Sequence, residues 1–228
     1  MKITWLGHSG FRIEAADQVL LVDPWLRGNP SFDESRFDEA IAGATHILIS
    51  HGHGDHASSA AEISRATGAP VVGIYDWATW LAATEKVEVI GFNKGGTVKL
   101  GAVAVTMVNA AHSSSMEIEG RPVYAGHESG YMIAAEGHVV YFMGDTDVMA
   151  DMGVFAELHK PDIGIVPIGG HFTMDPPRAA WACRKFFDFK TIIPCHYRTF
   201  PLLAQSASEM DVPGAKIVEP EVMKAITI

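Results

Sequence analysis

Six consecutive residues in the first quarter of the chain combine three imidazoles with one carboxylate. The run at residues 51–56 reads His-Gly-His-Gly-Asp-His and follows an apolar segment at residues 47–49. Imidazole nitrogens and carboxylate oxygens suit Zn²⁺ and similar first-row ions, and the interleaved glycines let the backbone turn several side chains toward one point. Because ligands at this spacing do not share one helix face, we expect an extended or looped backbone. The run therefore predicts a metal site at the end of a strand.

The competing interpretation of residues 51–56 is a histidine-rich surface loop or the remnant of a purification tag. Tags lie at chain termini and carry no interleaved glycine and aspartate, whereas this run lies inside the chain directly after an apolar segment. We therefore favour the metal site.

Three more residues that can bind metal also follow apolar segments. They are His112 after residues 105–109, Asp145 after residues 139–143 and His196 after residues 191–195. Loops that follow strands on a rigid scaffold can aim side chains into a shared cleft. Each of the three alone is more often structural than functional. Together with residues 51–56, they supply enough ligands for two ions that share one carboxylate.

The elements that must position these residues alternate between strand-like and helix-like patterns. Short β-type segments occur at residues 3–6, 19–22, 46–49, 71–74, 87–90, 103–108, 131–134 and 139–143. Helical patterns occur at residues 57–67, 76–84, 148–159, 177–187 and 202–210. Residues 162–166, the helix at 177–187 and residues 191–194 form a predicted βαβ unit. We expect an α/β protein with two sheets and helices outside them.

Length, charge and cysteine content narrow the class of protein. The 228 residues can bury one substantial core, so we expect a single domain over residues 1–228. A formal net charge of −10 argues against a nucleic-acid partner or an anionic membrane surface. Two cysteines suit a reducing cytosol, and neither a secretory signal nor a membrane-spanning stretch stands out. We expect a cytoplasmic protein whose partner is a small-molecule substrate.

The order and spacing of the candidate ligands resemble the metallo-β-lactamase superfamily. Further similar segments are KITWLGHS at residues 2–9, LVDPW at 21–25, GGHFTM at 169–174 and CHY at 195–197, so the resemblance covers nearly the whole chain. Within the superfamily, the chain is similar to a group of metal-dependent hydrolases related to the ascorbate-6-phosphate lactonases. The resemblance implies a four-layer αβ/βα sandwich with its metals at one edge of the facing sheets.

The resemblance also implies how the ligands divide between two ions. The first ion would take His51, His53 and His112, the second would take Asp55, His56 and His196, and Asp145 would bridge them. Asp23 would orient a ligand imidazole, with a plain turn residue before Pro24 as the alternative. His8 and His171 would lie near the opening, either as substrate contacts or as structural histidines. The chain departs from many members of the family at Gly170-His171, where they have Asp-Asn, and at Arg198, where Gly is common.

A dinuclear centre of this kind predicts hydrolysis. Two divalent ions about 3.5–4 Å apart can share a water, lower its pKa toward neutrality and polarise the bond to be cut. We therefore expect a metal-dependent hydrolase that uses a metal-bound hydroxide, with Asp55 and Asp145 as catalytic carboxylates, on an ester, lactone or phosphoester. Zn²⁺ is the expected ion, with Mn²⁺ or Fe as alternatives. Arg198, together with His171, would bind an anionic group of the substrate.

Three other functions remain open on the same residues. One is a phosphodiesterase or RNA-processing nuclease, although the acidic charge and the lack of a basic RNA-binding arm disfavour it. A second is an oxygen-reducing di-iron enzyme, which would normally carry a flavin domain that this length does not accommodate. The third is a non-catalytic metal-binding module. Seven candidate ligands with a position free for water favour catalysis over a closed structural site.

Overall fold

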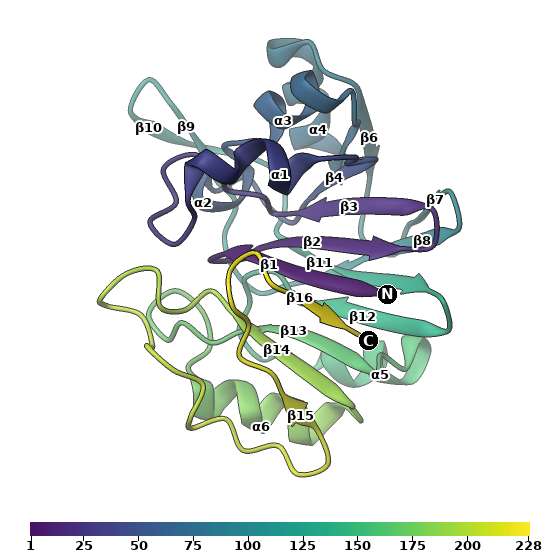
Figure 1. The fold of residues 1–228 in the computed structure, drawn as a ribbon, viewed down its shortest axis with the longest axis vertical. Helices are drawn as coiled ribbons and strands as arrows, with labels where there is room; N and C mark the ends of the chain where they lie inside the picture. Colours follow the sequence, from purple (N-terminus) through teal and green to yellow (C-terminus); the bar gives the residue numbers. More distant parts are fainter.

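Two seven-stranded sheets and the helices outside them make up the computed structural model, which describes residues 1–228. Figure 1 shows helices α1 to α4 on one side of the molecule and helices α5 and α6 on the opposite side, with the strands between them. This is the predicted α/β sandwich of four layers. No helix combines the length and the apolar character needed to cross a membrane.

The first sheet is antiparallel at one end and parallel at the other. Its strands, in spatial order, are β16 (Ala225–Thr227), β1 (Lys2–Gly7), β2 (Gly10–Ala15), β3 (Gln18–Val22), β4 (His46–Ile49), β5 (Val71–Ile74) and β6 (Val89–Phe92). Pairing is antiparallel from β16 to β3 and parallel from β3 to β6. Strand β5 is buried along its whole length, as expected for a parallel strand covered on both faces.

The second sheet has a similar division. Its strands, in spatial order, are β15 (Lys216–Ile217), β14 (Thr191–Cys195), β13 (Ile163–Pro167), β12 (His138–Phe142), β11 (Ser129–Ala135), β8 (Val103–Asn109) and β7 (Thr97–Leu100). Pairing is parallel from β15 to β12 and antiparallel from β12 to β7. A separate hairpin is formed by β9 (Ser115–Ile118) and β10 (Arg121–Tyr124), and it projects from the body of the fold in Figure 1.

The helices cover the outer faces of the sheets. They are α1 (Phe37–Ile41), α2 (Gly54–Ala57), α3 (Ala60–Thr67), α4 (Tyr75–Glu85), α5 (Asp151–His159) and α6 (Pro176–Phe186), with a 3-10 turn at Glu34–Arg36. Helix α6 begins as its sequence predicts, since the Asp175 side chain accepts from the backbone N–H of Arg178 and prolines occupy its first turn.

The core lies between the two sheets. Phe11 of β2 and Phe142 of β12 are both fully buried, with ring centroids 6.3 Å apart. The buried hydroxyl of Tyr131 on β11 donates a hydrogen bond to the carbonyl oxygen of Ile49 on β4. These contacts fix the first sheet against the second next to the end of β4, where residues 51–56 begin.

Some predicted elements differ in the structure. The helix expected at 202–210 is wrong, because this segment forms turns. Its buried Leu203, Ala207 and Met210 have helical spacing, but the Gln205 side chain donates to the carbonyl oxygens of Phe200 and Leu203. Such bonds between polar side chains and the backbone compete with a helix. The other differences are smaller. The helix predicted at 57–67 begins at Ala60 as α3, and the short helix α2 lies before it at Gly54–Ala57. Strand 87–90 lies at 89–92, and the short strands β2, β7, β9, β10, β15 and β16 had no predicted counterpart.

Candidate metal centre

The candidate ligands lie where strands of both sheets end. Residues 51–56 follow β4 in the first sheet, while His112, Asp145 and His196 follow β8, β12 and β14 in the second. The carbonyl oxygen of His8, just beyond β1, accepts from the backbone N–H of His196. The two sheets therefore deliver their polar side chains to one shared edge.

Residues 51–56 adopt two kinds of backbone. His51 lies before the first turn of α2, and His53 is the extended residue that precedes the helix. Asp55 and His56, in contrast, belong to α2 itself. The expectation of a looped backbone is therefore wrong for these two. Because neighbours on a helix point about 100° apart, adjacent residues can face one centre from different sides.

The first group of ligands, His51, His53 and His112, consists of imidazoles alone. Their ligating atoms all lie within 4.8 Å of one another, and Nε2 of His51 lies 3.0 Å from Nδ1 of His53. His51 is buried, whereas His53 and His112 are partly exposed. The arrangement places three imidazole nitrogens around one point, with one ring buried and two partly exposed.

The second group combines a carboxylate with imidazoles. Its members are Asp55, His56, His196 and also His8, with ligating atoms again within 4.8 Å of one another. The three histidines are buried, and the Asp55 side chain is 32% exposed. The second group is thus a buried histidine cluster with one carboxylate on its open side.

Asp145 lies between the two groups. Its Oδ2 is 2.9 Å from Nε2 of His196, 3.4 Å from Nε2 of His56 and 3.6 Å from Nε2 of His112. One carboxylate oxygen therefore faces imidazoles of both groups at once, which is the position that a bridging ligand needs.

Asp23 lies beneath the centre and is fully buried. Its Oδ2 accepts from Nδ1 of His56 at 2.8 Å and from the hydroxyl of Ser50 at 2.5 Å, and its Oδ1 accepts from the backbone N–H of Ser50. The hydroxyl of Ser50 also lies 2.9 Å from Nδ1 of His51. Asp23 thereby fixes the ring of His56 so that Nε2 points toward the centre, as a carboxylate that orients a ligand imidazole does.

His8 lies deeper than its sequence position suggested. It is fully buried rather than at the opening, with Nε2 3.0 Å from Oδ2 of Asp55 and Nδ1 2.9 Å from the hydroxyl of Thr199. Its backbone is left-handed, with φ at 52°. The signal that pointed to His112, Asp145 and His196, a polar residue directly after an apolar strand, applies equally to His8, which follows β1.

The two other candidate substrate contacts are exposed. The ring of His171 packs against Phe172, with centroids 4.6 Å apart. The guanidinium of Arg198 lies 5.6 Å from the ring centroid of Tyr197. Neither side chain forms a hydrogen bond or an ion pair with a candidate ligand. The structure therefore gives neither residue a contact with the candidate ligands, and their role toward a substrate stays a prediction.

Burial sets the protonation of the first group. It lowers the pKa of His51 well below the usual value, and it also lowers the pKa of His53 and His112. These imidazoles are therefore neutral at pH 7, which is the form that binds a metal.

The second group behaves differently because it contains carboxylates. Burial opposes a charge on His56, but the carboxylates of Asp145, Asp55 and Asp23 outweigh it and raise its pKa well above the usual value. Burial likewise acts to raise the pKa of Asp145, yet His196 and His56 hold it well below its usual range. A buried positive charge on His56 thus lies beside the negative charges of Asp145, Asp23 and Asp55.

The donor set fits a transition-metal ion. Buried Nε2 of His56 and Oδ1 of Asp145 have no hydrogen-bond partner within the protein. Leaving buried polar atoms unpaired costs about 1–3 kcal/mol each, so their presence side by side calls for an additional binding partner. Nitrogen and carboxylate ligands of this number suit Zn²⁺, Mn²⁺ and Fe alike.

Comparison with known proteins agrees with this geometry. Residues 2–196 match the model of the β-lactamase superfamily domain. A UPF0173 metal-dependent hydrolase of Cereibacter sphaeroides is 65% identical over 230 aligned positions, and one of Dinoroseobacter shibae is 64% identical, each alignment covering 100% of both proteins.

Solved structures show the same fold. Igni18, a metallo hydrolase from the archaeon Ignicoccus hospitalis, is 30% identical with a TM-score of 0.83, covering 100% of this chain and 98% of its own. The metallo-β-lactamase fold protein YhfI from Bacillus subtilis is 16% identical with a TM-score of 0.74, covering 99% and 98%. The chain therefore belongs to the β-lactamase superfamily and, within it, to the UPF0173 metal-dependent hydrolases.

Proposed function

We propose that this protein uses a dinuclear metal centre to hydrolyse a small molecule at an ester, lactone or phosphoester bond. The observation that carries the proposal is the position of Asp145, whose Oδ2 faces His196 and His112 at 2.9 and 3.6 Å. A carboxylate shared by two ligand groups is what two neighbouring ions require. The names of the relatives support metal-dependent hydrolysis but specify no bond.

Each ligand has an assigned place in this proposal. His51, His53 and His112 would hold the first ion, Asp55, His56 and His196 the second, and Asp145 both. Bound ions of this kind, Zn²⁺ or alternatively Mn²⁺ or Fe, lower the pKa of a shared water and polarise the oxygen of the bond to be cut.

The protein's own residues orient the reacting groups. A carboxylate can only accept hydrogen bonds, so the proton of His8 lies on Nε2 and points at Oδ2 of Asp55, while Nδ1 accepts from the hydroxyl of Thr199. Burial lowers the pKa of His8 to about 4, which keeps this ring neutral at pH 7. Asp55, partly exposed on the open side, is thereby held where it can align a water against a bound substrate.

The alternatives from the sequence are less well supported. A nuclease would need a basic surface for its substrate, and the net charge is −10. A non-catalytic metal module would be closed by its ligands, whereas Asp55, His53 and Gly54 line a hollow of about 300 Å³. A small-molecule substrate fits that size better than a nucleic acid does. The buried, unpaired Cys183 and Cys195 are in keeping with the cytoplasmic location that we propose.

Metal analysis combined with a substrate screen tests this function. The purified protein would be stripped with a chelator, reloaded with Zn²⁺, Mn²⁺ or Fe²⁺, and assayed on lactones, esters, thioesters and phosphodiesters. We expect up to about two ions per chain, because seven ligands exceed the four that one tetrahedral ion takes. The control is His159→Ala, which removes a histidine outside the centre. Absence of bound metal after reloading would refute the proposal.

A further inference from the structure

A second hollow is lined in part by Gly52 and Gly54, the two glycines of residues 51–56. It encloses about 560 Å³, within the range of roughly 300–1,000 Å³ that is typical of small-molecule sites. We call it the tryptophan pocket. Its apolar lining consists of Ala57, Ala61, Trp77, Trp80, Leu81 and Met116. None of these residues belongs to the ligand groups described above.

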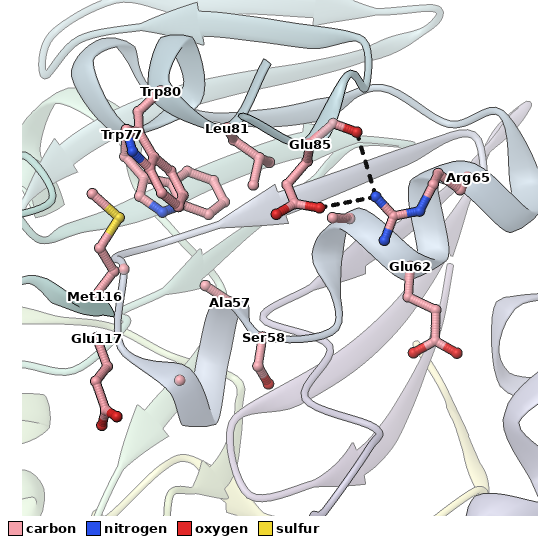
Figure 2. A pocket seen from close by; sticks show the side chains of 13 residues that line it. Ala57, Ser58, Glu62, Arg65, Trp77, Trp80, Leu81, Glu85, Met116 and Glu117 are labelled. Atoms are coloured by element: carbon pink, nitrogen blue, oxygen red, sulfur yellow. Dashed lines mark hydrogen bonds and ion pairs between the residues drawn. The ribbon is translucent and has the colours of Figure 1, made fainter. Parts of the chain in front are cut away.

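The two indole rings form one wall of the tryptophan pocket. Trp77 and Trp80 are three residues apart on α4, so they project from the same face of the helix. Figure 2 shows both rings beside Met116 at one end of the pocket, with Ala57 below them and the Arg65–Glu85 ion pair at the other end. Trp77 is buried, while Trp80 and Met116 are partly exposed and can meet a ligand. An apolar wall built from large rings favours an apolar occupant.

The tryptophan pocket adjoins the metal centre. The hollow of about 300 Å³ that is lined by His53 and Asp55 shares Gly54, Met116 and Glu117 with it. Gly52 separates His51 from His53 and packs against the pocket wall, since a Cβ added there would lie 3.4 Å from Cδ1 of Trp77. One molecule could therefore fill the pocket and still present a reactive group to His53 and Asp55.

The charge between the tryptophan pocket and the hollow beside His53 and Asp55 limits which substrates can extend from one to the other. Of the three shared residues, only Glu117 is charged, and it is exposed. At the far end, Arg65 is already paired with Glu85, and Glu62 is paired with Arg27. No free cation is left to receive an anionic tail, so an uncharged apolar group suits the pocket.

We propose that the tryptophan pocket binds the uncharged acyl chain of the substrate whose ester or lactone bond is cut at the neighbouring metal centre. This inference rests on the proposed hydrolysis and adds a specificity-determining site to it. The substrate class is thus an acyl ester or lactone with a medium-length apolar chain. Trp80 and Ala61 line the tryptophan pocket but not the hollow beside His53 and Asp55, and with Met116 they set the length of the chain.

Binding can be measured apart from catalysis. The probe is N-phenyl-1-naphthylamine, an uncharged dye whose fluorescence rises in an apolar site, titrated into metal-free and metal-loaded protein. Trp80→Ala removes one of the two indole rings, and Ala61→Leu adds a larger side chain to the pocket lining. We expect each to weaken dye binding about tenfold or more, as loss of an aromatic contact or of space does. The matched control, Trp181→Ala, removes an exposed tryptophan on α6 and should leave dye binding unchanged.

Two competitors test the charge argument with the same dye. Octanamide should displace the dye at lower concentration than octanoate, and Glu117→Gln should narrow that difference. Equal displacement by octanamide and octanoate in wild-type protein would overturn the assignment to an uncharged chain. Dye binding that neither Trp80→Ala nor Ala61→Leu weakens would overturn the pocket itself.

The link to catalysis is tested with 4-nitrophenyl esters of different chain length. In metal-loaded protein, Trp80→Ala should reduce kcat/KM for the hexanoate ester about tenfold more than for the acetate ester, because only the longer chain reaches the pocket. An equal loss on both esters would contradict the proposal. If none of the esters, lactones or phosphodiesters of the substrate screen is hydrolysed while the dye results hold, the proposed reaction fails and the pocket remains a binding site. The two failures are therefore distinguishable.

Discussion

The two ligand groups of the centre differ in charge, although they lie side by side. His51, His53 and His112 form a group of neutral imidazoles whose pKa values are lowered by burial. The other group places His56, with a raised pKa, among carboxylates. A cation in the first group meets only neutral ligands of its own, whereas one in the second meets compensating negative charge. The comparison predicts that the two ions of the proposed centre would not be equivalent.

Substitution of Asp145 should have the largest effect on activity and metal content. Asp145→Ala removes the one carboxylate that faces both groups, so we expect loss of hydrolysis and of about two ions per chain. His53→Ala should also abolish hydrolysis but lose only about one ion, because it belongs to the first group alone. Elemental analysis and circular dichroism measure metal content and fold. Wild-type metal content and rate in Asp145→Ala would show that this residue does not bridge.

Asp23 offers the next largest effect, through the hydrogen bond that it accepts from His56 of the second group. Asp23→Asn weakens the hydrogen bond that orients His56, so we expect metal affinity there to fall about 10- to 100-fold. The matched control is Asp162→Asn, since Asp162 holds Nδ1 of His138 in the same way at 2.6 Å but outside the centre. Competition with a chromogenic chelator measures the metal affinity of each variant. A similar loss in the two variants would mean that Asp23 acts only through general stability.

A change of pH should affect the two groups in opposite directions, without any substitution. Below about pH 6.5, the ordinary histidine value, the lowered pKa of His51 reduces the stability of the metal-free fold because the unfolded chain takes up the proton. The raised pKa of His56 has the opposite sign, so its contribution is complete below about pH 6.5 and is lost as pH rises through the raised value.

Metal binding must therefore displace a proton from His56 but none from His51. We expect release of about one proton per chain at pH 7, measured by titration calorimetry in buffers of different ionisation enthalpy. His56→Asn should abolish the release. Release that persists unchanged in that variant would contradict the assigned protonation.

Arg198 should give the smallest effect, because it is exposed and belongs to neither group. If it binds an anionic part of a substrate, Arg198→Ala should raise KM by about threefold to tenfold and leave kcat and metal content unchanged. Kinetics on a carboxylate-bearing and a neutral ester of equal length measure this. Identical KM values for Arg198→Ala and wild type on the charged ester would eliminate the role.

The sequence was most informative where chemistry is local. The residue types in 51–56 and the positions of His112, Asp145 and His196 after strands predicted candidate ligands, and the fold brings these side chains together. Residue type identifies a donor, and a strand before it indicates which edge it reaches. The four-layer fold followed from the family resemblance more than from periodicity, since a short apolar run can be helix or strand.

The sequence was least informative where the outcome depends on distant partners. The depth of His8 follows from its contacts with Asp55 and Thr199, which lie 47 and 191 residues away. Helical spacing at 203, 207 and 210 was misleading because side-chain bonds to the backbone hold that segment in turns. The tryptophan pocket needs α4 to lie against α2, α3 and the β9–β10 hairpin, and no local pattern specifies that placement.

The span of the ligands along the chain has a consequence for synthesis. The first group is complete once residue 112 has been made, but the second needs His196 and the docking of β14, whose next backbone N–H meets the carbonyl oxygen of His8. A growing chain emerges at about 5–20 residues per second, so several seconds separate the two events. During that interval a nascent chain contains every residue of the first group but lacks His196 of the second. The order of the strands therefore fixes the order in which the residues of the two groups are synthesised.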